Sequence, residues 1–427
     1  MITSPAFAGK RYAVLGLARS GLAAVEALVA SGAQVTAWDR QDVARAKVDP
    51  ANVLIADPLE IDLTGYDGVV VSPGVPLNTH PIAARAAQFG VPVIGDIELF
   101  AQARASLPPH KVVGITGTNG KSTTTALVHH ILQTAGVPTT MGGNIGLPIL
   151  AQDPLPEGGV YVLELSSYQI DLTYSLDCDV AVLLNVTPDH LDRYESFEAY
   201  RTSKLRLFEM SSGVQIEGQA NPPVVADAPS LQGPHNAQNA AAAAKVCAAL
   251  GMTSEQIARD FRTFTGLPHR MERVATHNGV TFVNDSKATN TDSSAPALAA
   301  YPREGDGPRI HWIVGGLPKE DGLGATEQHL ANVKAAYTIG EAGPRFAELL
   351  EPQVPVTRAE MLCEATRRAI EAAVPGDVVL LSPACASFDQ FKDYEQRGER
   401  FRQFVAALTE DPTSDPCTAD RSAESVS

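Results

Sequence analysis

Gly117-Thr118-Asn119-Gly120-Lys121-Ser122-Thr123 is the stretch that decides the fold of this chain. The apolar, β-branched run at 111–116 before it predicts a buried strand. After it, apolar residues at 127, 128, 131, 132 and 135 share one helical face, and Gly136 predicts the helix end. The stretch is therefore a glycine-rich turn between a strand and a helix.

Such a turn is suited to holding a polyphosphate. Glycines let backbone N–H groups approach phosphate oxygens, and a helix N-terminus adds partial positive charge. Lys121 can meet the terminal phosphates, while the hydroxyl of Ser122 or Thr123 can bind Mg²⁺. The match to a strict P-loop is incomplete, because Ile115 stands where its first glycine is expected. The pattern predicts an ATP site with Mg²⁺.

Length and charge limit the possible classes. A chain of 427 residues is long enough for two or three domains. Its formal net charge of −16 disfavours nucleic acid and anionic membranes as main partners. No signal-peptide pattern or membrane-spanning run is visible, and five scattered cysteines (178, 247, 363, 385 and 417) lack metal-ligand spacing. We expect reduced thiols in a cytoplasmic protein.

The first αβ block is typical of a dinucleotide-binding fold. Strands are predicted at 12–16, 34–38 and 69–71, with a helix at 21–30. The glycine fingerprint is degraded, because Ala18 occupies the second glycine position. Asp39 is placed for a ligand hydroxyl, and Arg19 or Arg40 for a ligand charge. A purely structural turn remains the alternative at this point.

The second block starts after a linker at 105–110 and contains the phosphate turn. Strands at 160–165 and 180–185 end near Glu164 and His190. Ligands of parallel sheets lie beyond the carboxyl ends of the strands, where Lys121 also lies. Glu and His can both bind Mg²⁺, although each residue alone is more simply a strand-end carboxylate or a loop histidine. Their convergence with Lys121 favours a metal–nucleotide site.

The third block has predicted strands at 280–283, 310–314, 336–339 and 378–381. From about Glu410 the chain loses apolar periodicity, which predicts a disordered tail. We therefore predict an α/β protein of three domains, a Rossmann-like N-terminal domain, a P-loop-like central ATPase domain and a Rossmann-like C-terminal domain. The predicted bounds are 1–104, 105–267, 268–409 and, for the tail, 410–427.

Several motifs, in order along residues 12–404, resemble the Mur ligases of bacterial peptidoglycan synthesis. They are the runs at 114–123, 142–146, 164–169, 185–192, 266–270 and 284–290. The run Ser382-Pro383-Ala384-Cys385-Ala386-Ser387-Phe388-Asp389-Gln390-Phe391 narrows the resemblance to the D-glutamate-adding branch.

The resemblance implies an ATP-dependent amide ligase that adds D-glutamate to UDP-N-acetylmuramoyl-L-alanine through an acyl phosphate. It implies two Mg²⁺ ions, one held by Ser122 or Thr123 with Glu164, the other near His190. It also implies that Lys204 is carbamylated and supports the second ion. The family's domains close around their substrates, so the linkers near 105 and 267 are hinge candidates. We expect a monomer.

The resemblance assigns binding roles residue by residue. Expected ATP contacts are Gly117, Thr118, Asn119, Gly120, Lys121, Ser122, Thr123, Thr124, Asn236, Asn239, Arg270 and Asp285. Expected contacts to the UDP substrate are Leu17, Ala18, Arg19, Ser20, Asp39, Arg40, Ser72, Pro73, Gly74 and Asn144. Expected D-glutamate contacts are Lys287, Thr289, Lys319, Ser387 and Phe388.

Three other functions stay open at this stage. A sibling ligase would add another amino acid or act on folate, although a folate enzyme should lack the complete first domain and the run at 382–387. A nicotinamide dehydrogenase is disfavoured by Ala18 and by the second phosphate site. A non-catalytic nucleotide-binding module would bind ATP without substrate-dependent hydrolysis. One departure from the family is a short segment, 205–231, where extra strands are usual.

Overall fold

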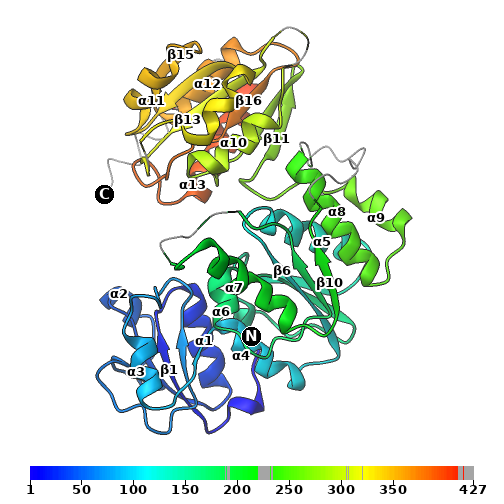
Figure 1. The fold of residues 1–427 in the computed structure, drawn as a ribbon. Coiled ribbons are helices and arrows are strands. Elements are labelled where there is room, and N and C mark those ends of the chain that lie inside the picture. Colours follow the sequence, from blue (N-terminus) through cyan, green and yellow to red (C-terminus); the bar gives the residue numbers. More distant parts are fainter. Residues whose placement is uncertain are drawn as a thin grey trace. The chain divides into compact units, whose positions relative to one another are not determined.

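The computed structural model describes residues 1–187, 189, 193–219, 231, 234–303, 305, 307–319, 321–411 and 417, with the backbone alone at 234 and 235. The chain divides into two compact units. Unit 1 comprises Met1–Val225 and Gln238–Arg262, and unit 2 comprises Ala226–Ala237 and Thr263–Ser427. Both are layered α/β structures (Figure 1).

The N-terminal part of unit 1 is a Rossmann-like layer structure. Its parallel sheet has the strand order β3-β2-β1-β4-β5. One face of β1 packs on α1 and the other on α3, because successive side chains of a strand point to opposite faces. The elements are β1 (Arg11–Leu15), α1 (Arg19–Ala30), β2 (Gln34–Trp38), α2 (Asp42–Arg45), β3 (Val53–Ile55), β4 (Gly68–Val71), α3 (Ile82–Gln88), β5 (Val93–Ile94) and α4 (Asp96–Ala103).

The central part of unit 1 is a second parallel sheet, in the order β10-β9-β6-β8-β7. Every residue of β8 is buried, as expected for an inner strand covered on both faces. The elements are β6 (His110–Thr116), α5 (Lys121–Thr134), β7 (Thr139–Gly143), β8 (Gly159–Glu164), α6 (Ser167–Asp171), β9 (Val180–Leu183), α7 (Phe197–Glu209), β10 (Val214–Glu217), α8 (Pro234–Ala249) and α9 (Ser254–Phe261).

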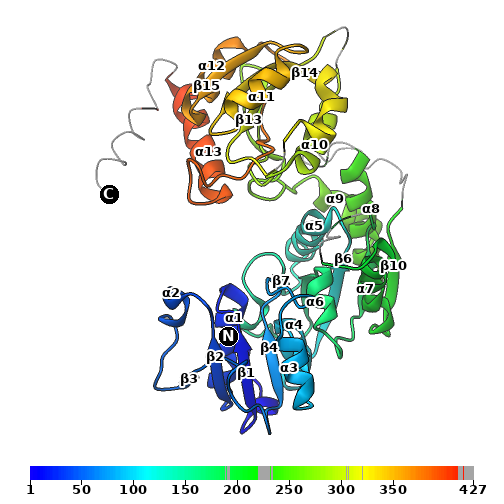
Figure 2. The same ribbon diagram turned by 60° about the vertical axis from the view of Figure 1, so that its left-hand side comes forward.

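Unit 2 has a sheet in the order β11-β12-β16-β13-β14-β15, parallel except for the pair β11–β12. Helices α10 and α11 cover one face, and α12 and α13 cover the other (Figure 2). The elements are β11 (Glu272–His277), β12 (Val280–Asn284), α10 (Thr291–Ala299), β13 (Ile310–Gly315), η4 (Gly324–Asn332), β14 (Val333–Ile339), α11 (Gly343–Leu350), β15 (Val356–Glu360), α12 (Leu362–Ala372), β16 (Val378–Leu381) and α13 (Tyr394–Glu410).

The predicted α/β class with three parallel layers is confirmed. The predicted strands and the helix after the phosphate turn are present within a few residues of their expected bounds. The short segment at 205–231 still contributes one strand, β10, paired with β9. No helix in the described part of the chain is long and apolar enough to cross a membrane.

The prediction that all five cysteines are reduced thiols is wrong for two of them. Cys363 at the start of α12 and Cys417 form a disulfide, with their Cα atoms 5.6 Å apart. The sequence separation of 54 residues hid this pairing, because only the fold brings the two positions together. The other three cysteines are buried and lie outside this disulfide. Apart from Asp411 and Cys417, the predicted tail beyond α13 lies outside the described residues.

Candidate active site

The phosphate turn joins β6 to α5 at the carboxyl end of the central sheet. Gly120 precedes the helix with φ of 84°, a left-handed conformation that favours glycine. A Cβ at this position would lie 2.1 Å from Oδ1 of Asn239. The side chain of Asn239 in α8 therefore packs directly against the turn, which agrees with its predicted place beside the nucleotide.

Asn185, just after β9, holds the turn in place. Its backbone carbonyl accepts from Thr118 N at 2.9 Å, and its side-chain Oδ1 accepts from Asn119 N at 2.9 Å. Its Nδ2 also donates to the Asn119 carbonyl at 3.0 Å. Because these bonds fix successive peptide groups, the turn keeps its shape without depending on a bound phosphate.

Two predicted lysines converge on the same carbonyl oxygen. Lys121 Nζ donates to Gly117 O at 3.0 Å and to Thr118 O at 2.9 Å. Lys204 Nζ, from α7, donates to Gly117 O at 2.9 Å. Burial, reinforced by the positive charge of Lys121, lowers the pKa of Lys204 to about 7. The structure thus gathers two amines at the turn, and Lys204 is 2% exposed rather than a surface lysine.

Glu164 ends β8, next to β6 in the sheet, and is 2% exposed. Its Oε1 accepts from Asn144 Nδ2 at 2.8 Å, whereas its buried Oε2 has no hydrogen-bond partner among the described residues. Burying a carboxylate oxygen without a hydrogen-bond partner costs free energy unless a cation or a water molecule contacts that oxygen. Glu164 therefore fits the predicted role of a Mg²⁺ ligand.

Of the two residues predicted to support the second Mg²⁺, the structure describes Lys204 alone. His190 lies outside the described residues. Within the described ranges, no three His, Cys, Asp or Glu side chains are grouped for a metal ion. Ser122 is buried and Thr123 half-buried, both in the first turn of α5 as predicted.

Two adjoining clefts of about 400 and 410 Å³ lie in unit 1. All ten residues predicted to bind the UDP substrate line one or both of them, although they come from four separate loops, after β1, β2, β4 and β7. These are Leu17, Ala18, Arg19, Ser20, Asp39, Arg40, Ser72, Pro73, Gly74 and Asn144.

The first strand-to-helix turn shapes these clefts. Gly16 has φ of 91°, and a Cβ there would meet Ser72 at 2.9 Å. Ser72 Oγ donates to Gly16 O at 2.8 Å, and Asp39 Oδ2 accepts from Leu17 N at 2.8 Å. Asp39 thus orders the turn as well as lining the cleft. Arg19 Nη2 donates to Gly146 O at 2.7 Å, which joins the N-terminal turn to the central loop at 142–146.

In unit 2, the predicted nucleotide residue Asp285 is 4% exposed at the carboxyl end of β12. It accepts from Ser382 Oγ at 2.8 Å and from Met271 N at 3.1 Å. Burial raises its pKa to about 7. Arg270 lies in the segment before β11 and interacts electrostatically with Asp285. Asn236 is half-buried in the first turn of α8.

The five predicted D-glutamate residues lie on loops after three neighbouring strands, β12, β16 and β13. Lys319 Nζ donates to Thr289 Oγ1 at 3.1 Å, so two of these loops meet directly. Lys287 Nζ lies 5.3 Å from the ring centre of Tyr394. Ser387 is buried, and Phe388 is 69% exposed.

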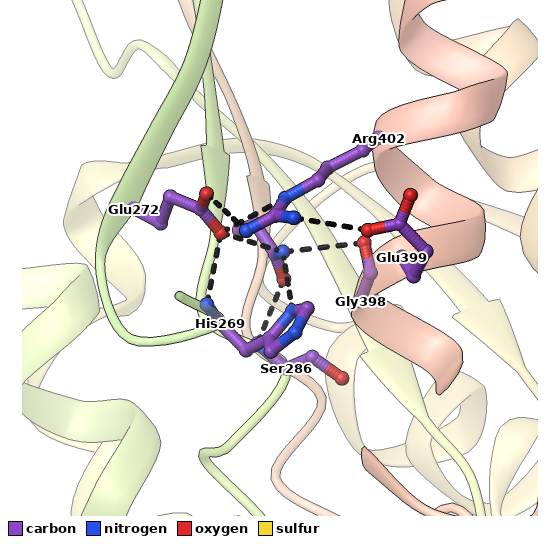
Figure 3. A network of polar contacts seen from close by, with 7 residues as sticks. His269, Glu272, Ser286, Gly398, Glu399 and Arg402 are labelled. Atoms are coloured by element: carbon purple, nitrogen blue, oxygen red, sulfur yellow. Dashed lines mark hydrogen bonds and ion pairs between the residues drawn. The ribbon is translucent and has the colours of Figure 1, made fainter. Parts of the chain in front are cut away.

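A polar network fixes the start of unit 2 to its last helix (Figure 3). Glu272 Oε2 accepts from His269 N at 2.8 Å, and Glu272 also pairs with Arg402 of α13. Asn284 Nδ2 donates to His269 Nδ1 at 3.0 Å and to the Gly398 carbonyl at 3.2 Å. His269 has φ of 61°, which this network maintains. The motif at 266–270 is therefore anchored in unit 2.

Sequence reasoning missed several residues of these surfaces. Gln169 lines the first cleft, of about 400 Å³, and its motif was recognised without assigning this side chain. Gln41, Lys47 and His80 line the second cleft, and no local pattern marked them. Asn185 was recognised as the end of a strand and the first residue of a family motif, but its hydrogen bonds to the phosphate turn were not predicted.

Comparisons with known proteins cover the three layers in order. Residues 10–95 match a model described as the Mur ligase MurD-like N-terminal domain. Residues 115–222 match the Mur ligase middle domain, and 269–385 the Mur ligase glutamate ligase domain.

Curated relatives align over nearly their whole length. A UDP-N-acetylmuramoylalanine–D-glutamate ligase of Novosphingobium aromaticivorans is 62% identical, over 98% of this chain and 99% of the relative. A protein with the same name from Sphingopyxis alaskensis is 58% identical, over 96% and 100%.

Among solved structures, a UDP-N-acetylmuramate–alanine ligase of Thermotoga maritima has a TM-score of 0.56 at 16% identity, covering 93% of this chain and 99% of that one. A MurF ligase of the same organism, in complex with ADP, has a TM-score of 0.55 at 16% identity, covering 95% and 96%. At this identity the likeness concerns the fold.

Proposed function

The chain belongs to the Mur ligase family, and we propose that the residues described above carry out the ATP-dependent joining of D-glutamate to UDP-N-acetylmuramoyl-L-alanine. Its activity is that of a UDP-N-acetylmuramoylalanine–D-glutamate ligase in peptidoglycan precursor synthesis. The observation that carries the residue assignment is the convergence of Lys121 and Lys204 on the phosphate turn, at the same sheet edge as Glu164.

The first step forms an acyl phosphate. A carboxylate oxygen of the alanyl group attacks the γ-phosphorus of ATP, the bond to the β-phosphate oxygen breaks, and ADP leaves. Such transfers depend on positioning and on neutralising charge. Lys121 is the residue that neutralises the terminal phosphates, and the backbone N–H groups of the turn hold them. Asn239 and Asn236 contact the adenosine, and Arg270 and Asp285 complete the nucleotide contacts.

Ser122 or Thr123 with Glu164 would hold one Mg²⁺, and His190 with Lys204 a second. When bound, these ions supply charge neutralisation between the phosphates and the attacking carboxylate. The unsatisfied Oε2 of Glu164 supports the first position. For the second, Lys204 must change from a cation to an anion. Carbamylation does this in two steps: the ammonium loses one proton, and the neutral amine then takes up CO₂ and loses a second proton to give a carbamate anion.

The second step forms the amide. The amine of D-glutamate attacks the acyl carbon, phosphate leaves, and the amine loses a proton. Lys287 and Lys319 are suited to the two carboxylates of D-glutamate as point charges, with Thr289, Ser387 and Phe388 around them. The ten residues of the two clefts hold the UDP substrate.

We further propose that the three domains are residues 1–104, 105–267 and 268–409, with a tail at 410–427. We also propose that the protein is a cytoplasmic enzyme, because it uses ATP as its energy source, and that it acts as a monomer. Size-exclusion chromatography with light scattering tests the oligomeric state.

The test follows phosphate release by purified protein with ATP, Mg²⁺, UDP-N-acetylmuramoyl-L-alanine and D-glutamate, omitting one component at a time. Release should require both substrates and disappear in Lys121→Ala. Phosphate release that requires a different amino acid in place of D-glutamate would support a ligase with another amino-acid substrate. Absence of substrate-dependent release would contradict the proposal.

A further inference from the structure

Arg397 in α13 is a buried arginine whose partners are uncharged. It is 1% exposed. Its Nε donates to Ser286 Oγ at 3.0 Å, and its Nη2 donates to the Ser286 carbonyl at 2.9 Å and the Cys385 carbonyl at 3.0 Å. Its Nη1 donates to the Ala386 carbonyl at 3.2 Å. A buried guanidinium is costly, so four directed hydrogen bonds at this position require an explanation beyond packing.

The acceptors belong to the loops that carry the candidate D-glutamate residues. Ser286 immediately precedes Lys287 in the loop after β12. Cys385 and Ala386 immediately precede Ser387 in the loop after β16. One planar group thus spans two neighbouring loops of the sheet edge.

The same group also reaches the third loop, through Ala386. The backbone of Ala386 pairs with Leu317 in both directions, each bond 2.9 Å long, and Leu317 lies in the loop that carries Lys319. Gly316, next to it, leaves room for the guanidinium. A Cβ on Gly316 would lie 3.1 Å from Arg397 Nη1 and 2.3 Å from the Ala386 carbonyl oxygen.

We propose that Arg397 is a positioning residue for D-glutamate, which sets the relative positions of the three loops bearing Lys287, Thr289, Lys319, Ser387 and Phe388. This inference rests on the proposed function of those loops. Arg397 does not contact the substrate in this role. It acts through Ser286, which adjoins Lys287, and through the backbone carbonyls of Cys385 and Ala386, which precede Ser387 in the loop after β16.

The charge of Arg397 contributes as well. None of its four acceptors is a carboxylate, and the one carboxylate that interacts with the guanidinium electrostatically, Asp389, lies in the loop after β16. A positive charge behind the loops favours a ligand with two carboxylates, and the low dielectric of the interior strengthens this effect.

The experiment compares Arg397→Met with the wild type and with Arg400→Met. Arg400 lies one turn further along α13 and bonds to Gln403 Oε1 at 2.8 Å, so this control makes the same chemical change away from the loops. KM is measured separately for D-glutamate, ATP and the UDP substrate. Arg397→Met should raise the KM for D-glutamate by about ten- to hundredfold, as for a displaced binding site. The other two KM values and Arg400→Met should stay within about twofold of the wild type.

Arg397→Lys should restore part of the D-glutamate affinity, because an ammonium keeps the charge but cannot reach all four acceptors. A folded Arg397→Met with an unchanged D-glutamate KM would overturn the inference, as would an equal rise in all three KM values. If Arg397→Met does not fold, Ser286→Ala tests the inference instead. This substitution removes the hydroxyl that accepts from Arg397 Nε and leaves the three hydrogen bonds of Arg397 to backbone carbonyls. It should raise the D-glutamate KM alone, and no rise would refute the inference. Inactivity of the wild type with D-glutamate would instead contradict the proposed function itself.

Discussion

Gly120→Ala tests whether the phosphate turn and Asn239 form one nucleotide site. The substitution places a methyl group where a Cβ would lie 2.1 Å from Asn239 Oδ1, at a residue with φ of 84°. Ordinary contact between such atoms requires a separation greater by about 1 Å or more. The amide of Asn239 must therefore move away from the turn.

Two separate costs follow from this geometry. The left-handed conformation strains alanine by about 1–2 kcal/mol, which lowers stability whatever the neighbouring atoms are. Displacing Asn239 should remove the proposed hydrogen bond to the nucleotide, worth about 0.5–1.5 kcal/mol, or a rise of about twofold to tenfold in the KM for ATP. The first cost appears in unfolding and the second in ATP kinetics.

Gly136→Ala separates the two costs. Gly136 follows the same helix with φ of 78°, and nothing lies within 4 Å of the Cβ it would gain. Both variants should therefore lose similar stability in urea unfolding, but only Gly120→Ala should raise the KM for ATP. Asn239→Ala should raise this KM too, and the double variant should be no worse than the more impaired single variant. An equal ATP KM in Gly120→Ala and Gly136→Ala would refute the reasoning.

Three further variants test other parts of the structure. Glu164→Gln keeps the shape and removes the charge at the unsatisfied Oε2. It should lower kcat by about 100-fold and raise the Mg²⁺ concentration needed for half-maximal rate; an unchanged Mg²⁺ dependence would exclude Glu164 as a ligand. Asp285 has a native pKa of about 7, raised from 3.8, so its stabilising contribution is complete below pH 3.8 and lost as the pH rises through about 7. Asp285→Asn cannot ionise and should gain up to about 4 kcal/mol relative to wild type between pH 4 and pH 7 in urea unfolding, and a flat difference would contradict this. Asp377→Asn weakens the acceptor shared by His311 Nε2 at 3.1 Å and Lys334 Nζ at 2.7 Å. It should cost about 1–3 kcal/mol in thermal unfolding and leave all three KM values unchanged, whereas a changed KM would place this cluster in the site.

The sequence predicted the inner strands of all three sheets and none of their edge strands. The missed strands are β3, β5, β7, β10, β11 and β15, and each lies at the edge of its sheet. Inner parallel strands are buried on both faces and appear as apolar runs. Edge strands are partly solvated, as in the polar Val356–Glu360 of β15, and their pairing depends on neighbours distant in the sequence.

The candidate site shows the same division. The strand-to-helix pattern predicted Lys121 and Glu164, and the family resemblance assigned the residues that line the clefts. Burial of Lys204 and the unsatisfied oxygen of Glu164 depend on how β6, β8 and α7 pack. The roles of Asn185 and Arg397 depend on backbone carbonyls, which every residue has and no sequence pattern can mark. The Cys363–Cys417 pair was missed for a related reason, since only the fold brings α12 to Cys417.

The network around His269 has a consequence for recombination between related genes. His269 and Glu272 are bonded to Asn284, Asn284 is bonded to the Gly398 carbonyl, and Glu272 pairs with Arg402. The segment at 269–272 and helix α13 are therefore held together by one network. A crossover placed before Gly266 would transfer this network whole, so the chimera would keep matched partners. A crossover between Glu272 and α13 would combine halves from different parents. The junction at 262–266 is therefore the natural point for exchanging the segment that carries the proposed D-glutamate residues.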